Sequence, residues 1–156
     1  MIAFFKEMYQ WNFLLSIPLT GWLVAQVLKT IINGILMGKF DVERMWGAGG
    51  MPSAHSATVC ALVVAALRLE GTHSPIFAIT VVLAVIVMYD AMGVRREAGE
   101  QAKILNHLLT NWMDEEAKRT PILGDKKLKE MVGHTPFEVL GGALLGTVIG
   151  ALIPIM

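Results

Sequence analysis

Two short segments carry residues whose types and spacing suit one kind of chemistry. The sequence reads Gly-Gly-Met-Pro-Ser-Ala-His-Ser-Ala at 49–57 and His-Thr-Pro-Phe-Glu-Val-Leu-Gly-Gly at 134–142. Each places a histidine at the beginning of an apolar run. Phosphoryl transfer through histidine needs a nucleophile, a group that orients it, an acid for the leaving group and donors for the phosphate oxygens. The two segments are candidates for these parts.

The second segment places a carboxylate one helical turn from a histidine. His134 and Glu138 are four residues apart, so on a helix the two side chains can face each other. The carboxylate could then accept the Nδ1 proton, fix the tautomer and raise the nucleophilicity of Nε2. The alternative is that these residues cap a helix that begins near Thr135 and Pro136.

The first segment has the composition of a helix start that binds an anion. Pro52 can occupy the first helical position, and Gly50 with the glycine before it allows a tight turn and close backbone approach. The free amides and the helix dipole favour phosphate around Ser53, Ala54 and His55. The alternative is an ordinary helix start after a loop. A histidine just inside an apolar helix favours function, since such residues are rare in membrane spans.

Composition and charge distribution predict an all-α, polytopic membrane protein with a single domain, residues 1–156. The chain is 54% hydrophobic and 17% charged, whereas soluble domains carry about a quarter charged residues. Four segments are apolar enough to be candidate spans: Trp11–Leu36, Ser53–Leu69, Pro75–Met92 and Pro136–Ile155. The formal net charge of zero argues against nucleic acid as a partner. Cys60 is the single cysteine, so no intrachain disulfide is possible.

Two further patterns concern packing. Residues Val94–Lys118 show apolar residues at helical spacing, which predicts an amphipathic helix at the interface or across the end of the bundle. The polar segment 119–133 is expected to be a loop or a short helix. Gly142, Gly146 and Gly150 recur every four residues in the last span and predict close packing against another helix.

Topology gathers the candidate residues on one side of the membrane. With four spans, both termini share one side, and the connections 37–52 and 93–135 share the other. The second side also receives Lys29, Asp90, Arg95 and Arg96. Arginine suits bidentate phosphate binding, although cations at a membrane edge also serve as anchors. Of the 13 Lys and Arg residues, 11 lie on or near this side, so the positive-inside rule predicts that it is cytoplasmic.

These residues resemble a known superfamily along essentially the whole chain. Pro52-Ser53-Ala54-His55-Ser56 is similar to the Pro-Ser-Gly-His-(Ser/Thr) motif of type 2 phosphatidic acid phosphatases, which are related to vanadium haloperoxidases. The segment from His134 to Gly146 resembles the last motif of that superfamily, His-x-x-x-Asp-Val-x-x-Gly-x-x-x-Gly. Tyr-Asp-Ala-Met-Gly-Val-Arg-Arg at 89–96 resembles a motif of the divergent bacterial branch.

The resemblance implies a phosphatase that needs no metal or other cofactor and works through a phosphohistidine. It implies His134 as nucleophile, Glu138 as its orienting carboxylate and His55 as the acid. It also implies that Ser53 and the Ala54 amide hold phosphate oxygens, with the membrane lipid phosphate as substrate. We add Gly50, Lys29, Arg95 and Arg96 as phosphate-binding candidates and Asp90 as their support. A metal-dependent hydrolase is a third possibility, with ligands from Asp90, Glu97, Glu138 and the histidines. No close metal-ligand spacing such as His-Glu-x-x-His supports it, so no metal site is predicted.

Two departures from the superfamily motifs motivate a second hypothesis. No Arg-Pro follows Lys29 at the spacing of the first motif, and Leu128 stands where the last motif has an arginine. The chain also offers about four spans against the six helices usual in the superfamily, so a homo-oligomer could complete the bundle. The leading hypothesis is a lipid phosphate phosphatase in a bacterial cell membrane. The alternative is a non-catalytic binder or carrier of lipid phosphates that uses the same anion site.

Overall fold

All regular structure in the described part of the chain is helical, which confirms the predicted all-α class. The computed structural model describes residues 12–37, 50–112, 128–130 and 132–155. Predictions made for residues 1–11, 38–49, 113–127 and 131 lie outside the described residues. The helices are α2 (Phe13–Met37), α3 (Ala54–Glu70), α4 (Pro75–Met92), α5 (Val94–Trp112) and α6 (Pro136–Leu152).

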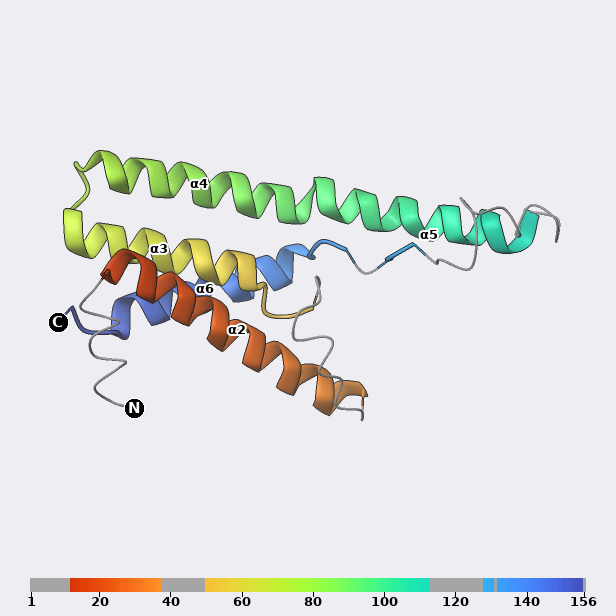
Figure 1. Cartoon of the computed structure of the whole chain (residues 1–156), viewed down its shortest axis with the longest axis horizontal. Helices are drawn as coiled ribbons and strands as arrows, with labels where there is room; N and C mark the ends of the chain where they lie inside the picture. The colour runs from red at the N-terminus through yellow and green to blue at the C-terminus, as the bar shows by residue number, and fades with distance from the viewer. Residues whose placement is uncertain (1–11, 38–49, 113–127, 131, 156) are drawn as a thin grey trace.

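Helix α3 is the centre of the bundle and contacts α2, α4 and α6 (Figure 1). Residues 71–74 join α3 to α4 in an antiparallel hairpin, whereas α6 runs parallel to α3. Helix α2 crosses α3 in the opposite direction, since Ile17 packs on Ala61 and Ala65, whereas Ala25 packs with Ala54 and Ala57. The end of α2, the start of α3, the end of α4 and the start of α6 therefore lie together, as the topology predicts.

The glycines of α6 allow it to lie directly on the backbone of α3. A Cβ atom added at Gly142 would meet the carbonyl oxygen of Ser53, and one at Gly146 would meet the carbonyl oxygen of Ala57. A Cβ at Gly150 would stand 2.8 Å from the Cβ of Val64. Small residues permit such close approach, and van der Waals contacts along the seam then hold the helices together. The predicted packing role of the glycines is confirmed.

Small side chains on α3 allow its other neighbours to approach as well. Ala57, Ala61 and Ala65 recur every four residues and are fully buried. Ile17 of α2 packs on Ala61 and Ala65. Because alanine side chains are short, neighbouring helices can pack close to the axis of α3.

The outer surface of the bundle is apolar, as expected for a surface in contact with lipid. Ile79, Val82, Val85 and Ile86 of α4 are each 58–66% exposed. By length and composition, two described helical stretches could cross a membrane: Phe13–Ile35, and the stretch Pro75–Leu109 that includes α4. Helix α6 is apolar but shorter, and α3 has 17 residues. The four predicted spans are thus confirmed as helices, and their number as membrane crossings stays a prediction.

The predicted amphipathic helix exists as α5, and of its two predicted positions the one across the end of the bundle is wrong, whereas the position at the interface stays a prediction. Helix α5 continues the direction of α4 beyond the bundle instead of lying across the end of the bundle (Figure 1). In this position, α5 contacts the segment that precedes α6. Asn106 donates from Nδ2 to the carbonyl oxygen of Leu128 at 2.9 Å, and a Cβ at Gly99 would stand 2.7 Å from the carbonyl oxygen of Glu130. The chain that leads to α6 therefore returns along α5.

The close seam between α3 and α6 can be tested with one methyl group. Gly146→Ala would force a Cβ onto the carbonyl oxygen of Ala57, and overpacking of this kind costs about 1–3 kcal/mol. We expect a clear loss of thermal stability in detergent micelles. Gly141→Ala is the matched control on the same helix, because its Cβ would meet only the terminal methyl of Met51 at 3.1 Å. Equal stability of the two variants would contradict the close seam.

Candidate active site

His134 is held in a short segment between the end of α4 and the start of α6. Its backbone amide donates to the carbonyl oxygen of Ala91 at 2.9 Å. Gly133, with φ +85°, precedes it, and a Cβ there would meet the backbone nitrogen of Arg96. Only glycine readily combines this backbone conformation with this close approach. The segment thereby fixes a histidine that is 4% exposed.

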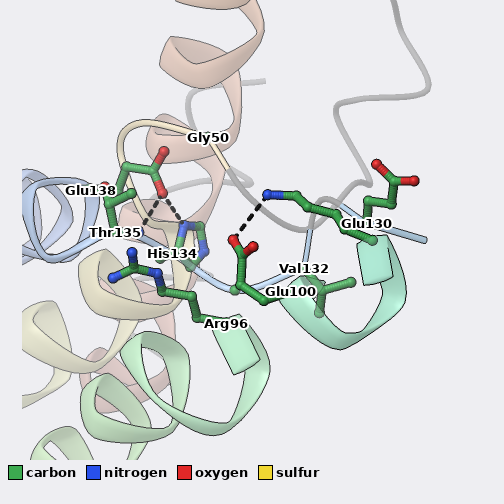
Figure 2. Close-up of a pocket in the computed structure, with 10 residues that line it drawn as sticks. Gly50, Arg96, Glu100, Glu130, Val132, His134, Thr135 and Glu138 are labelled. Carbon is green, nitrogen blue, oxygen red and sulfur yellow. Dashed lines mark hydrogen bonds and ion pairs between the residues drawn. The ribbon is translucent and has the colours of Figure 1, made fainter. Parts of the chain in front are cut away.

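Glu138 contacts the imidazole and caps α6 at the same time (Figure 2). Its Oε2 lies 3.2 Å from Nδ1 of His134 and accepts the backbone N–H of Thr135 at 3.0 Å. The N–H of Glu138 donates in return to Oγ1 of Thr135 at 3.3 Å, which completes a capping box. The two alternatives that the sequence left open are therefore both present. His134 itself precedes the helix, so the contact is not between two helical residues.

The environment of His134 favours its neutral form. Burial lowers the pKa of the imidazole below the ordinary histidine value, and the hydrogen bonds to Glu138 and to the backbone of Gly50 oppose this only in part. With the Nδ1 proton on the side of Glu138, the lone pair of a neutral ring lies on Nε2. A neutral imidazole with a fixed tautomer has the form that a nucleophile needs.

His55 faces His134 from the first turn of α3. The two ring centroids are 5.8 Å apart, with planes inclined at 67°. Nδ1 of His55 is buried and has no hydrogen-bond partner among the described residues. Segments that are 79 positions apart in the sequence thus bring two imidazoles to one place.

Both histidines line a cavity of about 530 Å³ that extends along α2. Its other polar side chains come from α2, from α3 and from the start of α5: Gln26, Lys29, Thr58 and Arg95. The Thr58 hydroxyl donates to the carbonyl oxygen of Ala54 at 2.7 Å. Lys29 is 3% exposed, although it lies in an otherwise apolar helix. Arg95 donates from Nε to Oδ2 of Asp90 at 2.6 Å, and a supporting role of Asp90 in the site stays a prediction. Trp22 and Val59 add apolar lining.

A second cavity, of about 210 Å³, lies on the Glu138 side of His134 (Figure 2). Four charged side chains line it in addition to Glu138: Arg96, Glu100, Lys103 and Glu130. Lys103 and Glu100 form an ion pair at 2.9 Å. The structure therefore separates the two adjacent arginines, because Arg95 lines the first cavity and Arg96 the second. Among the described residues, no group of three His, Cys, Asp or Glu side chains could hold a metal ion.

The first segment is arranged differently from the prediction at its start. Helix α3 begins at Ala54, with Ser53 as the N-cap, so Pro52 precedes the cap instead of opening the helix. Ser53 is fully buried; its hydroxyl accepts the Ser56 N–H at 3.4 Å, and its own N–H donates to the Glu138 carbonyl oxygen at 2.9 Å.

The hydroxyl oxygen of Ser53 thus accepts one hydrogen bond within the protein, and its backbone amide donates another. Ala54 lines the larger cavity. Gly50, with φ +87°, lines the smaller one. Phosphate binding by Ser53, Ala54 and Gly50 stays a prediction.

Sequence reasoning did not select Gln26, Trp22 or Lys103 as site residues. A signal existed for Gln26 and Trp22. They lie three and seven positions before Lys29, which is the spacing of one helix face. Lys103 had no such signal, since its position depends on how α5 continues α4.

The described site is therefore a pair of facing histidines in a helical bundle, with a carboxylate on the ring of the buried His134 and cations beside the pair. The comparisons show which family of membrane proteins has this sequence. The sequence model of the Divergent PAP2 family matches residues 10–149, and the chain belongs to this family. It is 43% identical over 144 residues to "Uncharacterized membrane protein YuiD" of Bacillus subtilis (strain 168), covering 88% of this chain and 91% of that protein. No solved structure matches the chain.

The contact between Glu138 and His134 can be tested by titration. We expect the pKa of His134, followed by NMR of nitrogen-labelled imidazole in micelles, to lie below the ordinary value of about 6.5. Glu138→Gln removes a charge and a hydrogen bond that raise this pKa, so it should fall further. Glu70→Gln, an exposed change at the far end of α3, should leave it unchanged. A higher pKa in Glu138→Gln would contradict the assignment.

Proposed function

We propose that this protein is a lipid phosphate phosphatase of the membrane that hydrolyses a phosphomonoester or pyrophosphate through a phosphohistidine at His134. The observation that carries the proposal is the pair of facing histidines, of which His134 is buried and has Nδ1 at 3.2 Å from Glu138. Family membership supports the same class of chemistry. The apolar outer surface supports a substrate that resides in the bilayer.

The proposed reaction has two steps. Nε2 of His134 attacks phosphorus, the bond between phosphorus and the leaving oxygen breaks, and His55 gives that oxygen a proton. Water then attacks the phosphohistidine, the phosphorus–nitrogen bond breaks, and His55 takes a proton from the water. Glu138 holds the ring in the tautomer whose Nε2 is unprotonated and stabilises positive charge on the ring.

Cations in the larger cavity suit the charge of this substrate. Lys29 and Arg95 line the same space as the two histidines, and Arg95 is positioned by Asp90. Positive charge that is fixed in a partly dehydrated site stabilises the phosphoryl oxygens in the transition state. Arg95 lies at the start of α5, outside the two segments in which the superfamily motifs have their arginines. We propose that it compensates for the arginines missing from those motifs.

The catalytic proposal is tested by phosphate release. Purified protein in mixed micelles should release phosphate from a panel of phosphatidate, phosphatidylglycerophosphate and polyprenyl phosphates with EDTA present. His134→Ala should abolish turnover, and His55→Ala should lower kcat by about 10²–10⁴-fold, the usual contribution of a general acid. Both losses follow from the removal of a group that reacts in the first step.

The matched control is His73→Ala, because His73 is exposed in the turn at the far end of the bundle. It should retain full activity. Turnover by His134→Ala would refute the assignment of the nucleophile. Binding of lipid phosphates without release by the wild-type protein would favour the binder or carrier instead, a function that the missing superfamily arginines motivate.

We also propose that the site faces the cytoplasm, because most Lys and Arg residues fall, by sequence, in or beside the connections predicted to share its side of the membrane. Labelling with a membrane-impermeant maleimide tests this in a background without Cys60. His73→Cys, in the turn between α3 and α4, should be labelled in intact cells. Lys103→Cys, on exposed α5, should be labelled only after permeabilisation. The reverse pattern would place the site outside.

A further inference from the structure

One buried polar atom in the larger cavity has no role in the proposed chemistry. The side-chain oxygen Oε1 of Gln26 is buried and has no hydrogen-bond partner among the described residues. The residue as a whole is 7% exposed. The great majority of buried polar side-chain atoms are paired, and an exception requires an explanation.

The position of Gln26 relates it to the substrate. It lines the same cavity as His55 and His134, on α2 and one turn from Lys29. Three residues of α-helix correspond to about 4.5 Å along the helix axis. Since α2 ends on the side where α3 and α6 begin, Gln26 lies deeper in the bundle than Lys29. With the phosphate near Lys29, the rest of a bilayer lipid would extend deeper into the bundle, toward Gln26.

Its chemistry differs from that of the groups around it. Lys29 and Arg95 are cations that donate hydrogen bonds, and they suit the oxygens of a phosphate. A carboxamide oxygen only accepts, and the dianion of a phosphomonoester has no proton to donate. The oxygen of Gln26 therefore suits a donor that belongs to another part of the substrate.

We propose that Gln26 accepts a hydrogen bond from a free hydroxyl of the substrate, so that the site selects lipid phosphomonoesters with a hydroxyl on the carbon next to the phosphorylated carbon. This rests on the proposed function. The hydroxyl can belong to the glycerol of a lysophospholipid or to a phosphorylated glycerol headgroup. A site built around such a hydrogen bond discriminates strongly against the analogue that lacks it, because its own polar atom is then left unpaired.

The test compares pairs of lipids that differ only in this hydroxyl. The pairs are lysophosphatidate and phosphatidylglycerophosphate, each against the analogue in which hydrogen replaces the hydroxyl. We expect wild-type kcat/KM to favour the hydroxyl-bearing member of at least one pair by about tenfold or more, and that pair identifies the source. Gln26→Met, similar in shape but without the amide, should abolish the preference. Gln101→Met, at an exposed position on α5, should retain it.

The ratio within a pair does not depend on how much of a variant is folded, so a poorly folded Gln26→Met remains informative. An unchanged ratio in Gln26→Met, or no preference in the wild type, would overturn the inference. If the wild-type protein releases no phosphate from any lipid, the proposed function fails, and equilibrium binding of the same pairs tests the hydroxyl preference alone. Tighter binding of the hydroxyl-bearing lipid that Gln26→Met loses supports the inference, and equal affinities overturn it.

Discussion

The site depends on the direct contact between the backbones of α3 and α6. Where Gly142 and Gly146 meet the carbonyl groups of Ser53 and Ala57, no side chain separates the two helices. Lipid tails are as apolar as the side chains, so helices in a bilayer associate through such packing and through polar contacts instead of through a hydrophobic driving force. Where both helices begin, the Ser53 amide donates to the carbonyl oxygen of Glu138. The starts of the two helices are thereby fixed together, and each carries one histidine.

His134 lies between two cavities of different character. The larger follows α2 and combines apolar lining with Lys29, Arg95 and His55, whereas the smaller is lined by charged residues of α5 and of the segment that returns along it. The proposed hydrolysis needs an apolar path for the bilayer lipid and a polar path for water. The split between Arg95 and Arg96 follows the same division, and it arises because neighbouring residues at the start of α5 point to different sides of the helix.

Much of the fold could be predicted from the sequence because its signals are local. Apolar runs predicted α2, α3, α4 and α6, and the glycine repeat predicted the contact surface of α6. The first residue of α3 was harder to predict, since both Pro52 and Ser53 are common at helix starts. Only the hydrogen bonds of Ser53 show that it is the N-cap. Glu138 was predicted either to orient His134 or to cap the helix. The cap is present, and the same carboxylate oxygen also lies 3.2 Å from Nδ1 of His134, so capping does not exclude the orienting role.

The remaining parts of the site depend on long-range geometry. Nothing in the spacing of Val94–Trp112 distinguishes a helix that turns across the bundle from one that continues α4. The lining of the smaller cavity therefore could not be predicted. Gln26 is different. It lies on the same helix face as Lys29, but an uncharged amide in an apolar run is a weak signal until its oxygen is found without a partner.

The glycine seam also determines how the two imidazoles can move relative to each other. If α6 slid along α3 by one or two residues, its glycines would move away from the carbonyl groups of Ser53 and Ala57 that they now face. The next position in which glycines again face that backbone is one repeat away, about 6 Å along the axis. The glycine seam therefore opposes small sliding movements of α6 along α3. The distance between His55 and His134 is held near one value because a gradual shift would lose this packing.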